Sequence, residues 1–124
     1  MNKILPIIAL ILLCAGAALA QGGKAEPQEI KFARGTTSAT LTAVLAGDQQ
    51  MEYSFTARAG QTAFFRCTTG FDYRLFHPDT GFDTEWTSGA DSFELPSDGQ
   101  YILYVRKKRS PVRRARYTLN ITIK

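Results

Sequence analysis

The sequence predicts an all-β protein, an antiparallel β-sandwich of about seven or eight short strands in a single domain. Three observations predict this fold class. Apolar and polar residues alternate in short stretches, which is the pattern of half-buried strands. Turn-forming Gly, Pro and Asp residues separate these stretches at short intervals. The 124 residues suffice for one modest domain, and no stretch keeps a helical period long enough to compete.

The first 20 residues are expected to be absent from the working protein. A short charged start precedes an apolar run from Ile4 to Leu13, and small residues follow up to Ala20, as in a cleavable secretory signal. Cleavage is predicted after Ala20, so that a flexible lead at 21–28 precedes a sandwich domain at 29–124. No later apolar run approaches the roughly 20 residues that span a bilayer, so no membrane insertion is expected.

Each predicted strand buries the alternating apolar residues of its stretch, while the residues between them are polar or β-prone. In chain order, the apolar sets are Leu41, Ala43 and Leu45; Tyr53, Phe55 and Ala57; Ala63, Phe65 and Cys67; Tyr73 and Leu75; Phe93 and Leu95; Tyr101, Leu103 and Val105; and Tyr117, Leu119, Ile121 and Ile123. The turns between them are predicted at Gly47-Asp48, Ala59-Gly60, Thr69-Gly70, Pro78 to Gly81, Ser88-Gly89 and Pro96 to Gly99.

The chain is predicted to be non-enzymatic, with no metal and no cofactor. Its acids fall singly in turns, and neither a metal cluster nor an internal disulfide can form from one histidine and one mature cysteine. His77 is interpreted as structural and Cys67 as a small buried hydrophobe, with an exposed thiol that pairs two chains as the alternative. Phe82 and Trp86, in a medium-length loop, are either a ligand platform or aromatics packed on the sandwich end.

Positive charge is concentrated in one segment. The formal net charge is +4, and it becomes +3 when the signal is removed, because Lys3 is the only charged side chain in the signal. Arginine predominates in the segment, which favours planar recognition of carboxylates or phosphates, and a secreted chain is not expected to bind nucleic acid. Residues 107–115 are expected to project as a hairpin loop from a rigid edge. Seven cations and no acid lie within the segment, which leaves a net charge of −4 elsewhere: Arg106, Lys107, Lys108, Arg109, Arg113, Arg114 and Arg116.

A further set of residues, spread along the whole mature chain, matches the pattern of one protein family. The residues are Phe32, Arg34 to Ala39, Gly47, Tyr53, Phe55, Ala57, Gly60-Gln61, Asp72 to Pro78, Phe93 to Pro96, Gly99 to Tyr101 and Tyr117 to Lys124. With this set, the chain resembles the periplasmic inhibitors of g-type (goose-type) lysozyme, small β-sandwich proteins of Gram-negative bacteria. The arginine loop is the more specific match, because the family has two arginines four residues apart and this chain has Arg109 and Arg113. The family has a functional tyrosine directly after the glycine that is Gly47 here, whereas this chain has Asp48.

The resemblance implies a periplasmic protein that blocks the cleft of g-type lysozyme with its arginine-rich loop and so protects peptidoglycan. A lysozyme cleft presents catalytic carboxyl groups, with which arginines can pair. The inhibitor would be a monomer or a weak dimer. The residues implied at the partner-binding face are Arg109 and Arg113 as principal anchors, Asp48 as a neighbour, and Lys107, Lys108 and Arg114 as secondary basic contacts.

Two other functions remain open at this point. One is a secreted β-sandwich module that binds an anionic glycan or an envelope polymer through the same loop, with a steep salt dependence. The other is a small envelope scaffold in which the loop is passive.

Overall fold

The computed structural model describes residues 27–32 and 37–124, which form eight strands and no helix. None of these residues forms a helix that could cross a membrane. The predicted signal with its cleavage site, residues 21–26 of the predicted lead and Arg34 to Thr36 of the family resemblance lie outside the described residues. The strands are β1 (Gln28–Glu29), β2 (Ser38–Ala46), β3 (Gln50–Ala57), β4 (Thr62–Cys67), β5 (Phe71–Phe76), β6 (Ala90–Glu94), β7 (Gly99–Lys107) and β8 (Arg114–Ile123).

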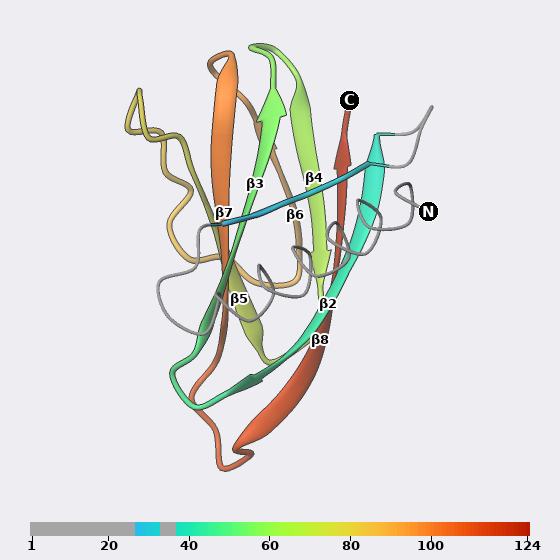
Figure 1. The fold of residues 1–124 in the computed structure, drawn as a ribbon, viewed down its shortest axis with the longest axis vertical. Helices are drawn as coiled ribbons and strands as arrows, with labels where there is room; N and C mark the ends of the chain where they lie inside the picture. The colour runs from blue at the N-terminus through green and yellow to red at the C-terminus, as the bar shows by residue number, and fades with distance from the viewer. Residues whose placement is uncertain (1–26, 33–36) are drawn as a thin grey trace, which may run out of the picture.

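The strands form two four-stranded sheets that enclose one core (Figure 1). Sheet A has the order β1-β3-β7-β5, and sheet B has the order β2-β8-β4-β6. Every strand pair is antiparallel except β1 with β3, which is parallel. The predicted all-β antiparallel sandwich is therefore confirmed.

The core between the sheets consists mainly of the alternating residues that the sequence predicts to be buried. Ile30 and Phe71 join it without having been predicted, and Leu41, Ala43 and Phe93 are only partly buried. Tyr73, Tyr101 and Tyr117 are fully buried, and burying a side chain of this size contributes roughly 1.5–3 kcal/mol. Their hydroxyl groups stay satisfied: the Tyr101 hydroxyl donates to the Ser97 carbonyl oxygen at 2.7 Å, and that of Tyr117 is hydrogen-bonded to the Tyr53 hydroxyl. Burial raises the pKa of Tyr73 and of Tyr117 above the usual phenol value, so both remain neutral.

Cys67 and His77 have structural roles, as predicted. Cys67 is a free, buried cysteine, and burial raises the pKa of its thiol to about 11. The His77 Nδ1 atom accepts a hydrogen bond from the Asp79 N–H at 3.2 Å, so Nε2 carries the proton that it shares with the Asp98 carbonyl oxygen at 2.9 Å. The alternative of an exposed thiol at Cys67 is wrong, because its side chain faces the core.

The segment between β5 and β6 folds back along the free edge of β5. Thr87 and Tyr73 exchange two backbone hydrogen bonds of 2.8 Å across this edge, which prevents the edge from pairing with another chain. Phe82 packs edge-on against Tyr101 at a ring-centroid distance of 6.1 Å. Trp86 instead lies over the guanidinium groups of outward-facing arginines of sheet A. The two loop aromatics therefore have separate environments.

The expectation of a hairpin loop after β7 is wrong. β7 lies between β3 and β5 in sheet A, whereas β8 lies between β2 and β4 in sheet B. The basic connection therefore crosses from one sheet to the other. Alternation in a sequence reports which side chains of a strand face the core, but it does not report which strand is the hydrogen-bonding partner.

Candidate functional site

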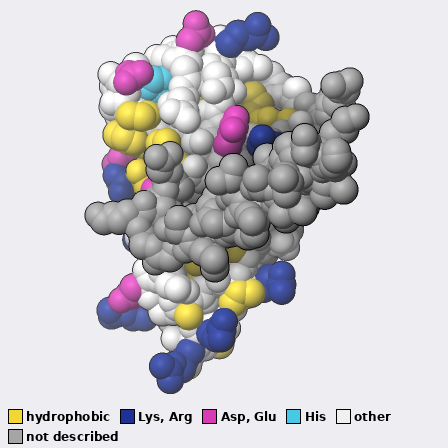
Figure 2. All heavy atoms as spheres, in the orientation of Figure 1, with side chains coloured by type: hydrophobic (Ala, Val, Ile, Leu, Met, Phe, Trp, Pro, Cys, Tyr) yellow, Lys and Arg dark blue, Asp and Glu magenta, His cyan; other side chains and the backbone are white. Residues whose placement is uncertain are grey.

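Two connections that are far apart in the sequence lie side by side at one end of the sandwich (Figure 1). The β2–β3 connection comprises residues 47–49 and the β7–β8 connection residues 108–113, and both cross between the sheets. The Gly47 N–H donates to the Arg113 carbonyl oxygen at 3.1 Å. Gly47 has a φ of 57°, a left-handed conformation that glycine adopts with little cost. Lys and Arg side chains gather at this end, the lower one in Figure 2.

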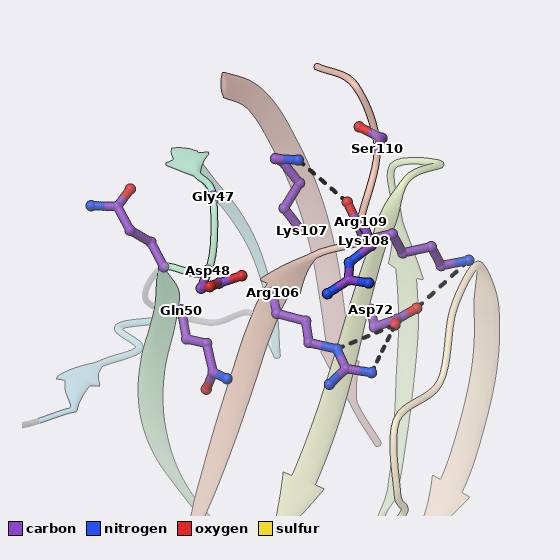
Figure 3. A pocket seen from close by; sticks show the side chains of 10 residues that line it. Gly47, Asp48, Gln50, Asp72, Arg106, Lys107, Lys108, Arg109 and Ser110 are labelled. Atoms are coloured by element: carbon purple, nitrogen blue, oxygen red, sulfur yellow. Dashed lines mark hydrogen bonds and ion pairs between the residues drawn. The ribbon is translucent and has the colours of Figure 1, made fainter. Parts of the chain in front are cut away.

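A hollow of about 530 Å³ separates the two connections. In Figure 3, Asp48 lies on its β2–β3 side and Arg109 on its β7–β8 side. The structure thus brings four of the sequence-predicted residues to one hollow, while Arg113 and Arg114 do not line it. The lining residues are Gly47, Asp48, Gln49, Gln50, Asp72, Arg106, Lys107, Lys108, Arg109 and Ser110.

Asp72 anchors the beginning of the basic segment. Its Oδ2 atom lies 3.3 Å from Arg106 Nη2, and its Oδ1 atom lies 3.7 Å from Lys108 Nζ (Figure 3). These distances are long for charged hydrogen bonds, so the attraction is mainly Coulombic. The Asp72 side chain is only 14% exposed, which limits screening by water. The Lys108 N–H also donates to the Gly70 carbonyl oxygen at 2.9 Å, so backbone and side chains hold this turn together.

Trp86 also holds Arg106 in place. The Arg106 guanidinium carbon lies 3.8 Å from the centroid of the Trp86 ring, a cation–π contact worth about 0.5–2 kcal/mol. Arg74 lies 5.8 Å from the same ring and is hydrogen-bonded through Nε to Asp83 at 2.8 Å. This hydrogen bond lowers the pKa of the Asp83 carboxyl. Arg106 is therefore a structural cation, held by Asp72 and Trp86.

The sequence did not point to Asp72 as a site residue, and it left Trp86 undecided. Asp72 and Arg106 are direct neighbours across β5 and β7, although 34 positions separate them in the chain. The only signal in the sequence is an acid on the polar side of one strand and a cation on the polar side of another. Such a signal becomes informative only when the register of the two strands is known.

Arg109 and Arg113 differ from the anchored cations. Neither forms an ion pair with another residue of the described chain, and both are exposed. Between them, Val112 donates its N–H to the Ser110 hydroxyl at 3.2 Å, and Pro111 restricts the backbone. The loop therefore presents two cations from a short, locally organised turn.

The secondary basic residues are spread around the same end. Lys107 ends β7 and donates through Nζ to the Lys108 carbonyl oxygen at 3.3 Å. Arg114 begins β8, is exposed, and pairs in register with Ala46 of β2. Arg114 thus lies outside the hollow but close to the β2–β3 connection.

The described residues include no group of three or more His, Cys, Asp and Glu side chains that could hold a metal ion. His77 is 1% exposed and has both ring nitrogens hydrogen-bonded. At the basic end, the cations that line the hollow are Arg106, Lys107, Lys108 and Arg109, side chains that can pair with carboxylates or phosphates.

No protein-family model and no curated protein sequence matches this chain. Solved structures do match. A periplasmic lysozyme inhibitor of g-type lysozyme from Salmonella Typhimurium has 27% sequence identity and a TM-score of 0.70, over 82% of this chain and 100% of that chain. A mutant of such an inhibitor from Escherichia coli has 25% identity and a TM-score of 0.65, over 79% of this chain and 97% of that chain.

A more distant structure shares the fold alone. The pre-peptidase C-terminal domain of collagenase from Bacillus anthracis has 19% identity and a TM-score of 0.55, over 80% of this chain and 95% of that chain. The higher identity and TM-score of the inhibitors confirm the resemblance that the sequence indicates.

Proposed function

We propose that this protein, which resembles the periplasmic inhibitors of g-type lysozyme in sequence and in fold, is itself a non-catalytic periplasmic inhibitor of that enzyme. Its basic end enters the active-site cleft and so protects peptidoglycan. The observation that supports this most directly is the position of Arg109. It lies on the wall of the hollow, exposed, at the end of a rigid sandwich, without an ion pair to any described residue.

The chemistry of the partner explains why arginine suits this position. A lysozyme cleft holds carboxyl groups that protonate the glycosidic oxygen and stabilise the attack. A guanidinium can pair with such a carboxylate through two parallel hydrogen bonds. Arg109 supplies the first anchor and Arg113, at the other end of the turn, the second. Pro111 and the Ser110–Val112 hydrogen bond reduce the freedom that the loop loses on binding.

The remaining predicted contacts have supporting roles. Lys107 and Arg114 add positive charge around the anchors, which accelerates association with an acidic cleft. Lys108 is paired with Asp72, so it acts mainly by holding the loop. Asp48 faces the same hollow and opposes binding, because it repels the carboxylates of the enzyme.

The test is peptidoglycan lysis by g-type lysozyme with the mature protein, residues 21–124, as inhibitor. We expect inhibition by the parent protein, and an inhibition constant about 100-fold higher or more for Arg109→Ala plus Arg113→Ala, since truncating one partner of a charged interface pair costs about 2–5 kcal/mol. The matched control is Arg58→Ala plus Arg66→Ala, which removes two exposed arginines elsewhere and should inhibit like the parent.

Full lysozyme activity at micromolar inhibitor, or a double variant as potent as the parent, contradicts the proposal. Retention on a polyanion resin with a steep salt dependence, without inhibition of g-, c- or i-type lysozyme, would instead identify a module that binds an anionic glycan.

A further inference from the structure

The arginine loop is too small to hold a protein partner by itself. The β7–β8 connection has six residues, 108–113, whereas a specific protein interface usually takes about 20–30 residues and about 800 Å² from each side. An enzyme that accepts this loop in its cleft must therefore also contact surface that continues from the loop. The outer faces of sheets A and B are the two surfaces nearby.

The outer face of sheet A carries a second hollow that continues from the first. It encloses about 440 Å³ and shares Gln50 and Arg106 with the hollow between the two connections. Both shared residues are labelled in Figure 3. The register places Arg74 beside Tyr104 and Gln50 beside Arg106 across β7. We call the six lining residues the aromatic shelf: Gln50, Arg74, Phe76, Trp86, Tyr104 and Arg106.

The composition of the two outer faces favours the shelf. Trp, Tyr and Arg are the residue types that dominate the binding energy of protein interfaces, whereas Ser and Thr are under-represented there. On the outer face of sheet B, small polar side chains bond to one another: Ser38 with Thr122 at 2.9 Å, and Thr40 with Asn120 at 2.8 Å. These groups are already satisfied. The exposed apolar side chains of that face, Val44 and Phe64, lie on separate strands, β2 and β4, whereas the shelf gathers Trp, Tyr and Arg around one hollow.

The shelf is organised before any partner arrives. Arg106 lies 3.8 Å from the Trp86 ring centroid, and the neighbouring Thr87 is held to Tyr73 by two backbone hydrogen bonds of 2.8 Å. A side chain that is already ordered loses little entropy on binding, whereas a free one costs about 0.5–1.5 kcal/mol. Binding at the shelf should therefore cost little side-chain entropy.

The charges and the stacking indicate a protein surface rather than a sugar as the occupant. Arg74 is paired with Asp83 and Arg106 with Asp72, so the shelf is nearly neutral while the adjacent loop is basic. A sugar ring needs an open aromatic face, but Arg106 covers one face of Trp86. An enzyme with an acidic cleft and a less charged rim would meet charge at the loop and apolar atoms at the shelf.

We propose that the lysozyme surface beside the active-site cleft rests on the aromatic shelf, where Tyr104 and Trp86 form a second contact area next to Arg109. This inference rests on the proposed function. It assigns two tasks to two regions: the loop supplies charge pairing, and the shelf supplies apolar contact that is insensitive to salt.

The first test compares Tyr104→Thr with Phe64→Thr. Both replace a strand aromatic on an outer face by a β-branched residue, and Phe64 is 42% exposed on sheet B. We expect Tyr104→Thr to raise the inhibition constant about 10-fold, as for an interface hot spot, chiefly through faster dissociation and with the parent's salt dependence. Phe64→Thr should inhibit like the parent, and thermal melting should show both variants folded.

The second test needs no substitution. The chain has one tryptophan, so labelling the inhibitor with 5-fluorotryptophan gives a single ¹⁹F resonance, that of Trp86. We expect this resonance to shift on addition of g-type lysozyme. An unchanged resonance at saturating lysozyme overturns the inference even if the Tyr104 variant fails to fold.

The outcomes separate this inference from the function on which it rests. If the parent inhibits, the Arg109 and Arg113 double variant does not, and Tyr104→Thr stays within twofold of the parent, only the shelf contact is overturned. If the parent does not inhibit, both proposals fail. Binding to isolated peptidoglycan that is lost in Tyr104→Thr also overturns the inference, since the shelf would then be a glycan site.

Discussion

The two halves of the basic segment have the same sign of charge but are held in different ways. In the first half, Arg106 and Lys108 pair with Asp72, and Arg106 also lies against Trp86. In the second half, Arg109 and Arg113 form no ion pair with any residue that the structure describes. The difference shows that charge density alone does not reveal which cations are already paired within the protein. The anchored half fixes the base of the loop, and the other half remains available to an anionic partner.

The physical origin of this difference is the end of β7. Arg106 belongs to a central strand of sheet A, where neighbouring strands place Asp72 directly beside it. After Lys107 the chain leaves sheet A. Lys108 still reaches Asp72, but Arg109 and Arg113 lie in the connection, where no neighbouring strand places an acid beside them. A like-charged cluster is costly unless it is compensated, and Asp72 of sheet A compensates only Arg106 and Lys108, the cations within its reach.

The largest effect should come from the half without ion pairs. We expect Arg109→Ala to raise the inhibition constant against g-type lysozyme by about 30-fold or more, while the free energy of unfolding stays within about 0.5 kcal/mol of the parent. Lysis assays and urea denaturation measure the two quantities. A variant that loses stability together with inhibition would show that Arg109 also supports the fold, and the division into halves would not hold.

The anchored half should respond in the opposite way. We expect Arg106→Ala to lower the free energy of unfolding by about 1–2 kcal/mol, because it removes a cation–π contact and leaves the partly buried Asp72 carboxylate with a weaker partner. Urea denaturation provides the measurement, with Arg66→Ala, an exposed arginine of β4, as the control. If both variants unfold alike, Arg106 is not an anchor.

A smaller effect of opposite sign should come from Asp48. We expect Asp48→Asn to lower the inhibition constant by about 2–5-fold, because it removes an acid that lines the same hollow as Arg109 and would repel the enzyme's carboxylates. The gain should disappear in 0.5 M salt, where the Debye length falls to a few ångströms. An unchanged or higher inhibition constant at low salt would mean that Asp48 stabilises the loop rather than opposing the partner.

The sequence predicted the fold from alternation, and the core residues from Tyr53 through Ile123 follow it closely. It could not predict that β7 and β8 lie in different sheets, because alternation carries no information about pairing partners. The predicted pair Arg109 and Arg113 came from the resemblance to the inhibitors of g-type lysozyme, which have two arginines at the same spacing. The anchoring role of Asp72 could not be predicted, because Asp72 reaches Arg106 only through the register of β5 and β7.

The smallest expected effect is on the rate of association with lysozyme, and it should differ between the adjacent Lys107 and Lys108. Lys108 pairs with Asp72 at 3.7 Å and its side chain is 47% exposed, whereas Lys107 forms no ion pair with a described residue. Exposed pairs contribute about 0–1 kcal/mol, so neither substitution should change stability much. At low salt, Lys107→Ala should slow association with lysozyme about twofold. Lys108→Ala should slow it less, because Asp72 already balances that charge near the surface. Stopped-flow measurements of the association rate constant over a salt series would detect this difference. If the association rate depends on salt equally in the two variants, Lys108 contributes to association as much as Lys107 does, despite its pairing with Asp72.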